Sequence, residues 1–378
     1  MTGVEVAIGA GGSALTRWHG AWLGALTGIS EPPAEPKATC ADCVMCAGVE
    51  RSGSAVTFSP DVKCCDYVPY LANFIAGRSL LGPGRDSIRA RIAGRAGVTP
   101  LGLGLTYAEI GRIVAARSQT GGVPEVLCPH FDLHTGGCAI WESRNAVCST
   151  WFCQHERGAV SQRFWHAVRD LLIAVEEGVA RACLADAGLP SEQMRFVLAH
   201  RAAIATAIAR ANSGVELHDD TPPDDESADW YAQLWGEWEG REEEWFVRCA
   251  ESVDHVAAPS SIAPWSIAPA SFAPTDAVRD CVEVVRDRWR ELQAHDVPDR
   301  LVFRPGAGSH STADELRLVG YSPFDPLVLP ARLLADLQRL DGRPIAPAGG
   351  VIGCGGMPLS GQVLEQLHDF GVAVVSPA

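Results

Sequence analysis

Cysteine is the residue type in this sequence whose number and spacing could do chemistry. The chain has thirteen cysteines, and nine of them fall in one stretch that is rich in Gly, Pro and Asp. The first cluster is the triple motif Cys40-x-x-Cys43-x-x-Cys46, followed by the adjacent pair Cys64 and Cys65. The second cluster consists of Cys128, Cys138, Cys148 and Cys153.

This spacing is typical of metal binding. Two residues between cysteines let both sulfurs reach one ion, as in the knuckles that hold zinc. Three cysteines in series at that spacing surround a [4Fe–4S] cluster whose fourth ligand comes from elsewhere. Both kinds of site need deprotonated thiols, and both add their binding energy to folding. The sequence therefore predicts a region folded around metal, either an iron–sulfur cluster or a zinc or iron ion.

All nine cysteines are candidate ligands, and the sequence does not divide them between sites. Adjacent residues rarely both reach one ion, so we expect one ligand from the pair Cys64 and Cys65. Three nearby histidines could also bind zinc or iron, although an exposed or supporting role is favoured for each; they are His130, His134 and His155. Ordinary thiols are expected at the remaining cysteines, which are Cys183, Cys249, Cys281 and Cys354.

The second cluster resembles the zinc- or iron-chelating cysteine-cluster proteins, the CxxCxxCC or YkgJ-like family. The matching positions are Cys128-Pro129, Gly137-Cys138, Ile140-Trp141, Arg144, Cys148 and Phe152-Cys153. The resemblance covers residues 38–158 and implies a bound zinc or iron. Ala47 stands where the family has a further cysteine, and we expect Cys64 or Cys65 to replace it. The flagellin lysine N-methylase shares the cluster, so the resemblance also implies methyl transfer as an alternative.

Composition and charge exclude several classes of function. The chain carries 46 acidic and 31 basic residues, a net charge of −15. This balance argues against binding along nucleic acid or at an anionic membrane surface, both of which require basic residues. No stretch has the ~20 uncharged apolar residues of a membrane span, and no secretory signal is recognisable. We expect a cytoplasmic protein, where thiols stay reduced.

The predicted fold class is mainly α, with a small irregular metal-organised region, a helical hairpin and a C-terminal winged-helix-like α+β module. Apolar periodicity predicts a helix over 107–117 and a pair of helices over 161–212. Gly188 and Pro190 separate that pair, and Ser191 is the expected N-cap of the second helix. A later helix carries a stripe of core residues, namely Trp230, Leu234, Trp238 and Trp245.

The last hundred residues alternate helical and strand-like patterns. Thr275 is expected to begin a helix that runs to about His295. Further elements are predicted as strands over 301–304 and 315–319, a helix over 329–340 ended by Gly342, a helix over 360–370 and a strand over 372–375. This order weakly resembles the PqqD-like winged helices, which implies peptide binding as an added strand on a sheet edge.

Five segments follow from these patterns. They are an N-terminal arm (1–37), a cysteine-cluster domain (38–158), a helical segment with an acidic loop (159–256), an Ala/Pro linker (257–274) and the winged-helix-like module (275–378). The acidic loop contains Asp219, Asp220 and Asp224, whose spacing does not match a calcium loop, so a solvated loop is favoured. The linker has three Ala-Pro dipeptides, which exclude a regular helix.

The function predicted from these features is a cytosolic metal-binding protein whose role is structural, redox or metal handling. One alternative is a metal-dependent enzyme that modifies proteins or peptides, for example a methylase, with the C-terminal module presenting the substrate. Another is a zinc-stabilised scaffold for protein contacts. No Ser-His-Asp order, P-loop or HExxH motif identifies a reaction, so the sequence names no catalytic residue. A metal ion and a peptide or protein are the expected partners.

Overall fold

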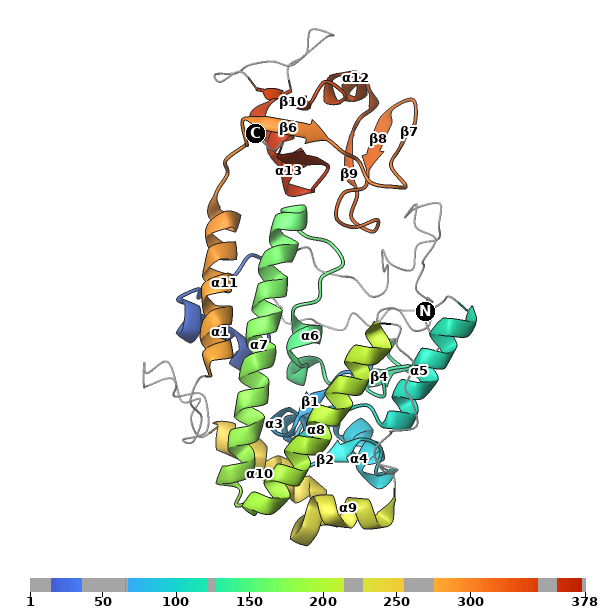
Figure 1. The fold of residues 1–378 in the computed structure, drawn as a ribbon, viewed down its shortest axis with the longest axis vertical. Helices are drawn as coiled ribbons and strands as arrows, with labels where there is room; N and C mark the ends of the chain where they lie inside the picture. The colour runs from blue at the N-terminus through green and yellow to red at the C-terminus, as the bar shows by residue number, and fades with distance from the viewer. Residues whose placement is uncertain are drawn as a thin grey trace. The chain divides into compact units, whose positions relative to one another are not determined.

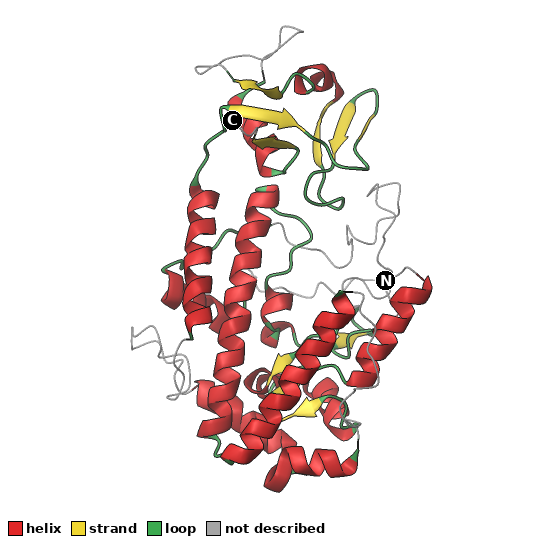
Figure 2. Cartoon of the chain, in the orientation of Figure 1, coloured by secondary structure: helices red, strands yellow, loops and turns green. Residues whose placement is uncertain are grey.

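The structure of this protein is a computed structural model that describes residues 15–35, 65, 67–120, 127–213, 227–254, 275–345 and 359–375. These residues are mainly helical and include four small antiparallel sheets, which confirms the mainly α class (Figure 2). No helix in these ranges is both long and apolar enough to span a membrane. The acidic loop, the Ala/Pro linker and the first-cluster residues Cys40, Cys43, Cys46 and Cys64 lie outside them.

The chain divides into two compact units. The first comprises residues 1–34, 65–150 and 169–282, and the second comprises 35–64, 151–168 and 283–378. The described cysteines of the two clusters are thus divided between the units, because Cys65, Cys128, Cys138 and Cys148 fall in the first and Cys153 in the second. The five segments expected from the sequence remain predictions.

Close helix packing defines the core of the first unit. Its helices include α1 (Arg17–Thr27), α3 (Asn73–Leu80), α4 (Arg85–Ala93) and α10 (Glu242–Asp254). A Cβ atom at Gly77 of α3 would lie 1.9 Å from the carbonyl oxygen of Phe246 in α10. Only glycine therefore permits this approach of the two helices.

The predicted helical hairpin is present. Helix α7 (Gly158–Asp186) contributes residues to both units, and α8 (Ser191–Asn212) runs back from the turn after it (Figure 1). The N-cap of α8 is Pro190, not Ser191 as predicted, because Pro190 keeps an extended backbone while its carbonyl accepts from the amide of Met194. The helix predicted over 107–117 is α5 (Tyr107–Thr120).

The tryptophan stripe is core, as predicted. It belongs to three elements rather than one helix: α9 (Ala228–Trp235), the 3₁₀ turn η4 (Gly236–Trp238) and α10. Gly236 has φ of 53°, which breaks the helix at that point. The side chains cover a sheet of β1 (Leu71–Ala72), β3 (Gly102–Leu103) and β2 (Val98–Thr99) in that spatial order, and the indole of Trp235 donates to the carbonyl of Val98 at 3.3 Å.

In the C-terminal part, Thr275 caps α11 (Asp276–Gln293) as predicted, since its hydroxyl accepts from the amide of Val278 at 3.3 Å. The second unit has two three-stranded sheets, and its last helix is α13 (Gly361–Asp369). One sheet is β10 (Asp341–Pro344), β6 (Arg300–Phe303) and β11 (Ala373–Val375), in that order. The other is β7 (His310–Ser311), β8 (Glu315–Leu318) and β9 (Leu327–Pro330).

The helix predicted over 329–340 is wrong. The segment begins inside β9, whose residues alternate between buried and exposed, and continues as the 3₁₀ turn η5 (Ala331–Leu333) and the one-turn helix α12 (Leu334–Leu337). The apolar residues of this segment pack in one core with Leu301 of β6 and Leu367 of α13. Their spacing along the chain resembles that of one helix face, although they belong to different elements. Gly342 lies within β10 rather than after a helix.

Candidate metal centre

A short hairpin organises the first two cysteines of the second cluster. Strands β4 (Phe131–Asp132) and β5 (Gly137–Cys138) pair so that Phe131 faces Cys138. The Asp132 carboxylate accepts from the amide of His134 at 2.9 Å, which stabilises the turn. The hairpin places Cys138 near Cys128, because the Cys138 thiol contributes to raising the pKa of Cys128. The amide of Cys128 also donates to the carbonyl of Cys65 at 2.7 Å.

The Cys128 sulfur lies in an environment suited to a metal-bound thiolate. The backbone N–H groups of His130 and Phe131 lie near it and favour the thiolate, which lowers the pKa of Cys128, and the Phe131 amide donates to the Cys128 carbonyl at 3.0 Å. Burial opposes them more strongly and raises the pKa of Cys128 to about 11. A bound cation would offset that desolvation, since metals coordinate the deprotonated thiol. The donors at this hairpin therefore fit a thiophilic metal.

His130 and His134 have supporting or exposed positions. The hydroxyl of Ser87 donates to the carbonyl of Gly84 at 2.8 Å, so it accepts from Nδ1 of His130 at 2.9 Å. Burial lowers the pKa of His130 to about 4, and the ring is neutral at neutral pH. His134 is exposed at the tip of the hairpin.

Cys148 lies on α6 (Ala146–Ser149), a single turn of helix. Its amide donates to Oδ1 of Asn145 at 3.0 Å, and its carbonyl accepts from Nη1 of Arg144 at 3.2 Å. The Arg144 guanidinium stacks over Trp141, 3.5 Å from the ring centre. The spacing of Trp141, Arg144 and Cys148 thus has a physical basis, because the first two residues hold the backbone of the third.

The helix that carries Cys148 also receives support from distant residues. The amide of Ala146 donates to Oε1 of Glu176 at 2.7 Å, and the same oxygen lies 2.7 Å from Nε2 of His19. His19 and Glu176 are 0% and 5% exposed. Burial raises the pKa of Glu176, while the contacts from His19 and Ala146 lower it.

In the second unit, the residues after Cys153 are fastened by a buried hydrogen-bonded chain. The amide of His155 donates to Oδ2 of Asp325 at 2.9 Å, and the Tyr321 hydroxyl donates to the same oxygen. Because that hydroxyl hydrogen is committed, Tyr321 accepts from Nδ1 of His155 at 3.2 Å. Burial lowers the pKa of His155 to about 4 and raises the pKa of Asp325.

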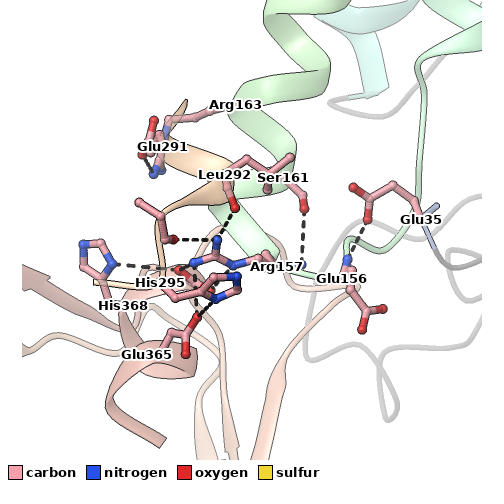
Figure 3. Close-up of polar contacts among 12 residues, drawn as sticks. Glu35, Glu156, Arg157, Ser161, Arg163, Glu291, Leu292, His295, Glu365 and His368 are labelled. Atoms are coloured by element: carbon pink, nitrogen blue, oxygen red, sulfur yellow. Dashed lines mark hydrogen bonds and ion pairs between the residues drawn. The ribbon is translucent and has the colours of Figure 1, made fainter. Parts of the chain in front are cut away.

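Two further charged residues hold this turn within the second unit. Arg157 donates to Asp369 at 2.7 and 2.9 Å and to the carbonyl of Ala294 at 2.9 Å. Figure 3 shows its guanidinium among residues of α11 and α13. Glu35 accepts from the amide of Glu156 at 2.6 Å and from the Trp165 indole at 2.8 Å (Figure 3 for Glu35 and Glu156). The segment that follows Cys153 is therefore a firmly held turn.

The predicted ligands are only partly within the described residues. Cys40, Cys43, Cys46 and Cys64 lie outside them, whereas Cys65, Cys128, Cys138, Cys148 and Cys153 lie within them. In the described ranges, no group of three or more His, Cys, Asp or Glu side chains is arranged to hold a metal ion. Two of the cysteines expected to be ordinary, Cys183 and Cys249, are buried, Cys281 is partly buried, and Cys354 is outside the described ranges.

The supporting residues Glu176, His19, Asp325 and Tyr321 were not found from the sequence. Each acts on a residue far along the chain, and none stands in a recognisable spacing. Arg144 alone had a signal, its place in the pattern of the resemblance.

Comparison with protein-family models, with curated proteins and with solved structures gives no match to this chain.

Proposed function

We propose that this chain is a metal-binding protein whose cysteines hold an iron–sulfur cluster or a zinc or iron ion. Cys65, Cys128, Cys138, Cys148 and Cys153 would act with the first-cluster cysteines Cys40, Cys43, Cys46 and Cys64. The observation that carries the proposal is the close association of three candidate ligands: the Cys128 amide donates to the carbonyl of Cys65 at 2.7 Å, and the hairpin that follows Cys128 ends at Cys138.

The charge state of these thiols is set by burial and by the neighbouring thiol. A buried thiol with a pKa of about 11 is protonated at neutral pH, and two neighbouring thiolates repel each other. Burial and the neighbouring thiol therefore keep Cys128 protonated in the absence of a cation. A thiophilic cation removes both penalties, because it stabilises the deprotonated sulfurs that bind it.

The bound metal would close the loop between the two clusters and, if it is iron–sulfur, supply electron transfer. The residues of this chain orient the sulfurs: the hairpin places Cys128 and Cys138, and Arg144 and Asn145 fix the backbone of Cys148. These roles hold for any of the three metals, so the proposal covers them together.

Elemental analysis of anaerobically purified protein tests the proposal. We expect bound metal in the wild type, and a large loss from the variants Cys128→Ser and Cys138→Ser. The matched control is Cys183→Ser, a buried cysteine outside the clusters, which should keep its metal. Unchanged metal content in both cluster variants would contradict the proposal. A brown preparation indicates iron–sulfur, and a colourless one containing zinc excludes it.

A second proposal concerns the C-terminal module, for which we retain a winged-helix-like arrangement that binds a peptide at a sheet edge. Its support is that β9 and β11 are edge strands with exposed side chains at Val328 and Val375. The arrangement requires a middle helix over 345–358. Amide hydrogen exchange in the full chain should show protection there, and immediate exchange would contradict it.

Methyl transfer is the remaining enzymatic alternative. It requires a binding site for the methyl donor. Calorimetric titration with S-adenosylmethionine distinguishes it from metal handling, since an absence of saturable binding counts against a methylase.

A further inference from the structure

A buried ion pair in the first unit supports the helix that carries Cys148. His19 of α1 and Glu176 of α7 are joined by the 2.7 Å contact between Nε2 and Oε1. Glu176 Oε1 also accepts the amide of Ala146, the first residue of α6. Oε1 therefore lies within hydrogen-bond distance of both the Ala146 amide and Nε2 of His19.

Burying this polar pair is energetically unfavourable if its two residues serve only to fill the core. His19 is fully buried, and its Nδ1 has no hydrogen-bond partner among the described residues. Buried charges and unpaired polar atoms are unfavourable, and apolar side chains of similar volume often serve as well. A buried polar pair at this position is therefore better suited to orienting the groups that it contacts than to stabilising the fold.

The pair acts on the backbone two residues before the predicted metal ligand Cys148. The first amides of a helix have no partner within it, and a carboxylate at that end is electrostatically favoured. Asn145 satisfies the amide of Cys148, and Glu176 satisfies that of Ala146. Together they fix the position and direction of a one-turn helix that has too few internal bonds to fix itself.

We infer that Glu176 and His19 are positioning residues of the metal centre, which act on the Cys148 ligand through α6. His19 holds the carboxylate, and the carboxylate holds the helix. The inference rests on the proposed function, and it brings the N-terminal helix α1 into the support of the metal. Partners of this kind, outside the ligands themselves, commonly set metal affinity and ligand orientation.

Release of Zn²⁺ to a chelator from the reconstituted full chain tests this inference. We expect Glu176→Met to release zinc roughly 10- to 100-fold faster than the wild type. Glu176→Gln keeps an oxygen acceptor for the Ala146 amide and should stay close to the wild type. Reconstitution with Co²⁺ gives a second readout, because a displaced Cys148 thiolate changes the sulfur-to-cobalt absorption.

The control for loss of packing is Val179→Ala, which opens a cavity in the same helix at a fully buried position. It should leave zinc release and the cobalt spectrum unchanged. Equal release rates in Glu176→Met and Val179→Ala would overturn the inference. If Glu176→Met does not fold, His19→Phe and His19→Gln decide, because only glutamine retains an N–H donor for Glu176. Equal rates in those two would likewise overturn it.

Failure of the proposed function looks different. A wild type that takes up neither Zn²⁺ nor Co²⁺ removes the metal centre itself, and the inference with it. A wild type that binds metal, with variants that release it at the same rate, removes only the positioning role.

Discussion

The hairpin of Cys128 and Cys138 and the turn of Cys148 are held by different kinds of contact. In the hairpin, strand pairing and backbone amides position the sulfurs, and all these groups lie within eleven residues of one another along the chain. In the Cys148 turn, a carboxylate and an imidazole from α7 and α1 complete the support. The first arrangement is mainly one of local backbone contacts, although the Cys128 amide also donates to the carbonyl of Cys65 and the Asp132 side chain stabilises the turn. The second depends on two buried polar side chains.

The difference indicates how each region responds to change. A locally held ligand should keep its geometry when distant residues are substituted. A ligand held by remote side chains should be displaced by a single substitution far along the chain. Cys153 belongs to the second kind, because Asp325 and Tyr321 hold His155, two residues after it.

Removal of the metal is expected to have the largest effect on both regions. A strong chelator under reducing conditions should lower the free energy of unfolding by roughly 5 kcal/mol or more, since metal binding is coupled to folding. Denaturant titration of the holo and chelated protein measures the difference. A chelated protein with unchanged stability would show that neither region depends on metal.

Loss of the remote support of Cys148, the pair Glu176 and His19, should have the second largest effect on stability. Glu176→Met leaves the His19 imidazole without its one hydrogen-bond partner among the described residues, and we expect a loss of about 3–5 kcal/mol in the metal-free protein. Glu176→Met combined with His19→Phe removes both polar groups and should recover most of that loss. Thermal or denaturant unfolding of the three proteins gives the coupling. A double variant as unstable as the single one would show that the pair contributes stability by itself.

Helix α8 contains no cysteine, and the titration of its His200 therefore provides a pH reference for this comparison. Burial, and secondly Arg201, lower the pKa of His200 from 6.5 to about 4. Between these two pKa values, the unfolded state therefore binds a proton on His200 and the folded state does not. The stability that is present above pH 6.5 is consequently lost as the pH falls toward 4. The loss should reach up to about 3 kcal/mol.

His200→Phe should flatten this part of the stability profile of the metal-free protein. Release of metal on acidification, which follows protonation of the thiolates, should be unaffected by the substitution. A shifted metal-release profile in His200→Phe would show that the two regions are coupled.

The smallest expected effect comes from the local support of Cys148. Arg144→Lys removes the planar stacking on Trp141 and weakens the bond to the Cys148 carbonyl. We expect a loss of about 1–2 kcal/mol and little change in zinc release, measured beside Glu176→Met. A larger effect on release than that of Glu176→Met would reverse the ranking of local and remote supports.

Sequence patterns predicted the parts of this structure that depend on neighbours along the chain. The helical hairpin, the Thr275 cap and the core position of the tryptophans followed from apolar periodicity and capping chemistry. The segment 329–340 failed because leucines of β9 and α12 share one core, and their spacing fits a helix as well.

For the candidate site, spacing identified cysteines but not their supports. Arg144 could be found because it is one of the positions that carry the resemblance to the cysteine-cluster family. Glu176 and His19 are 157 residues apart, and Asp325 acts on a backbone amide 170 residues away. Their roles arise only when the fold brings those segments together, so no local sequence pattern indicates them.

The proposed metal centre requires that the cysteines bind metal in the intact protein. The decisive measurement is the metal-to-protein ratio after anaerobic purification, made on the wild type and on a variant with Cys128 and Cys138 both replaced by serine. We predict bound zinc or iron in the wild type and its loss from the variant. A wild type without metal that also fails to take up zinc or iron on reconstitution would contradict the account.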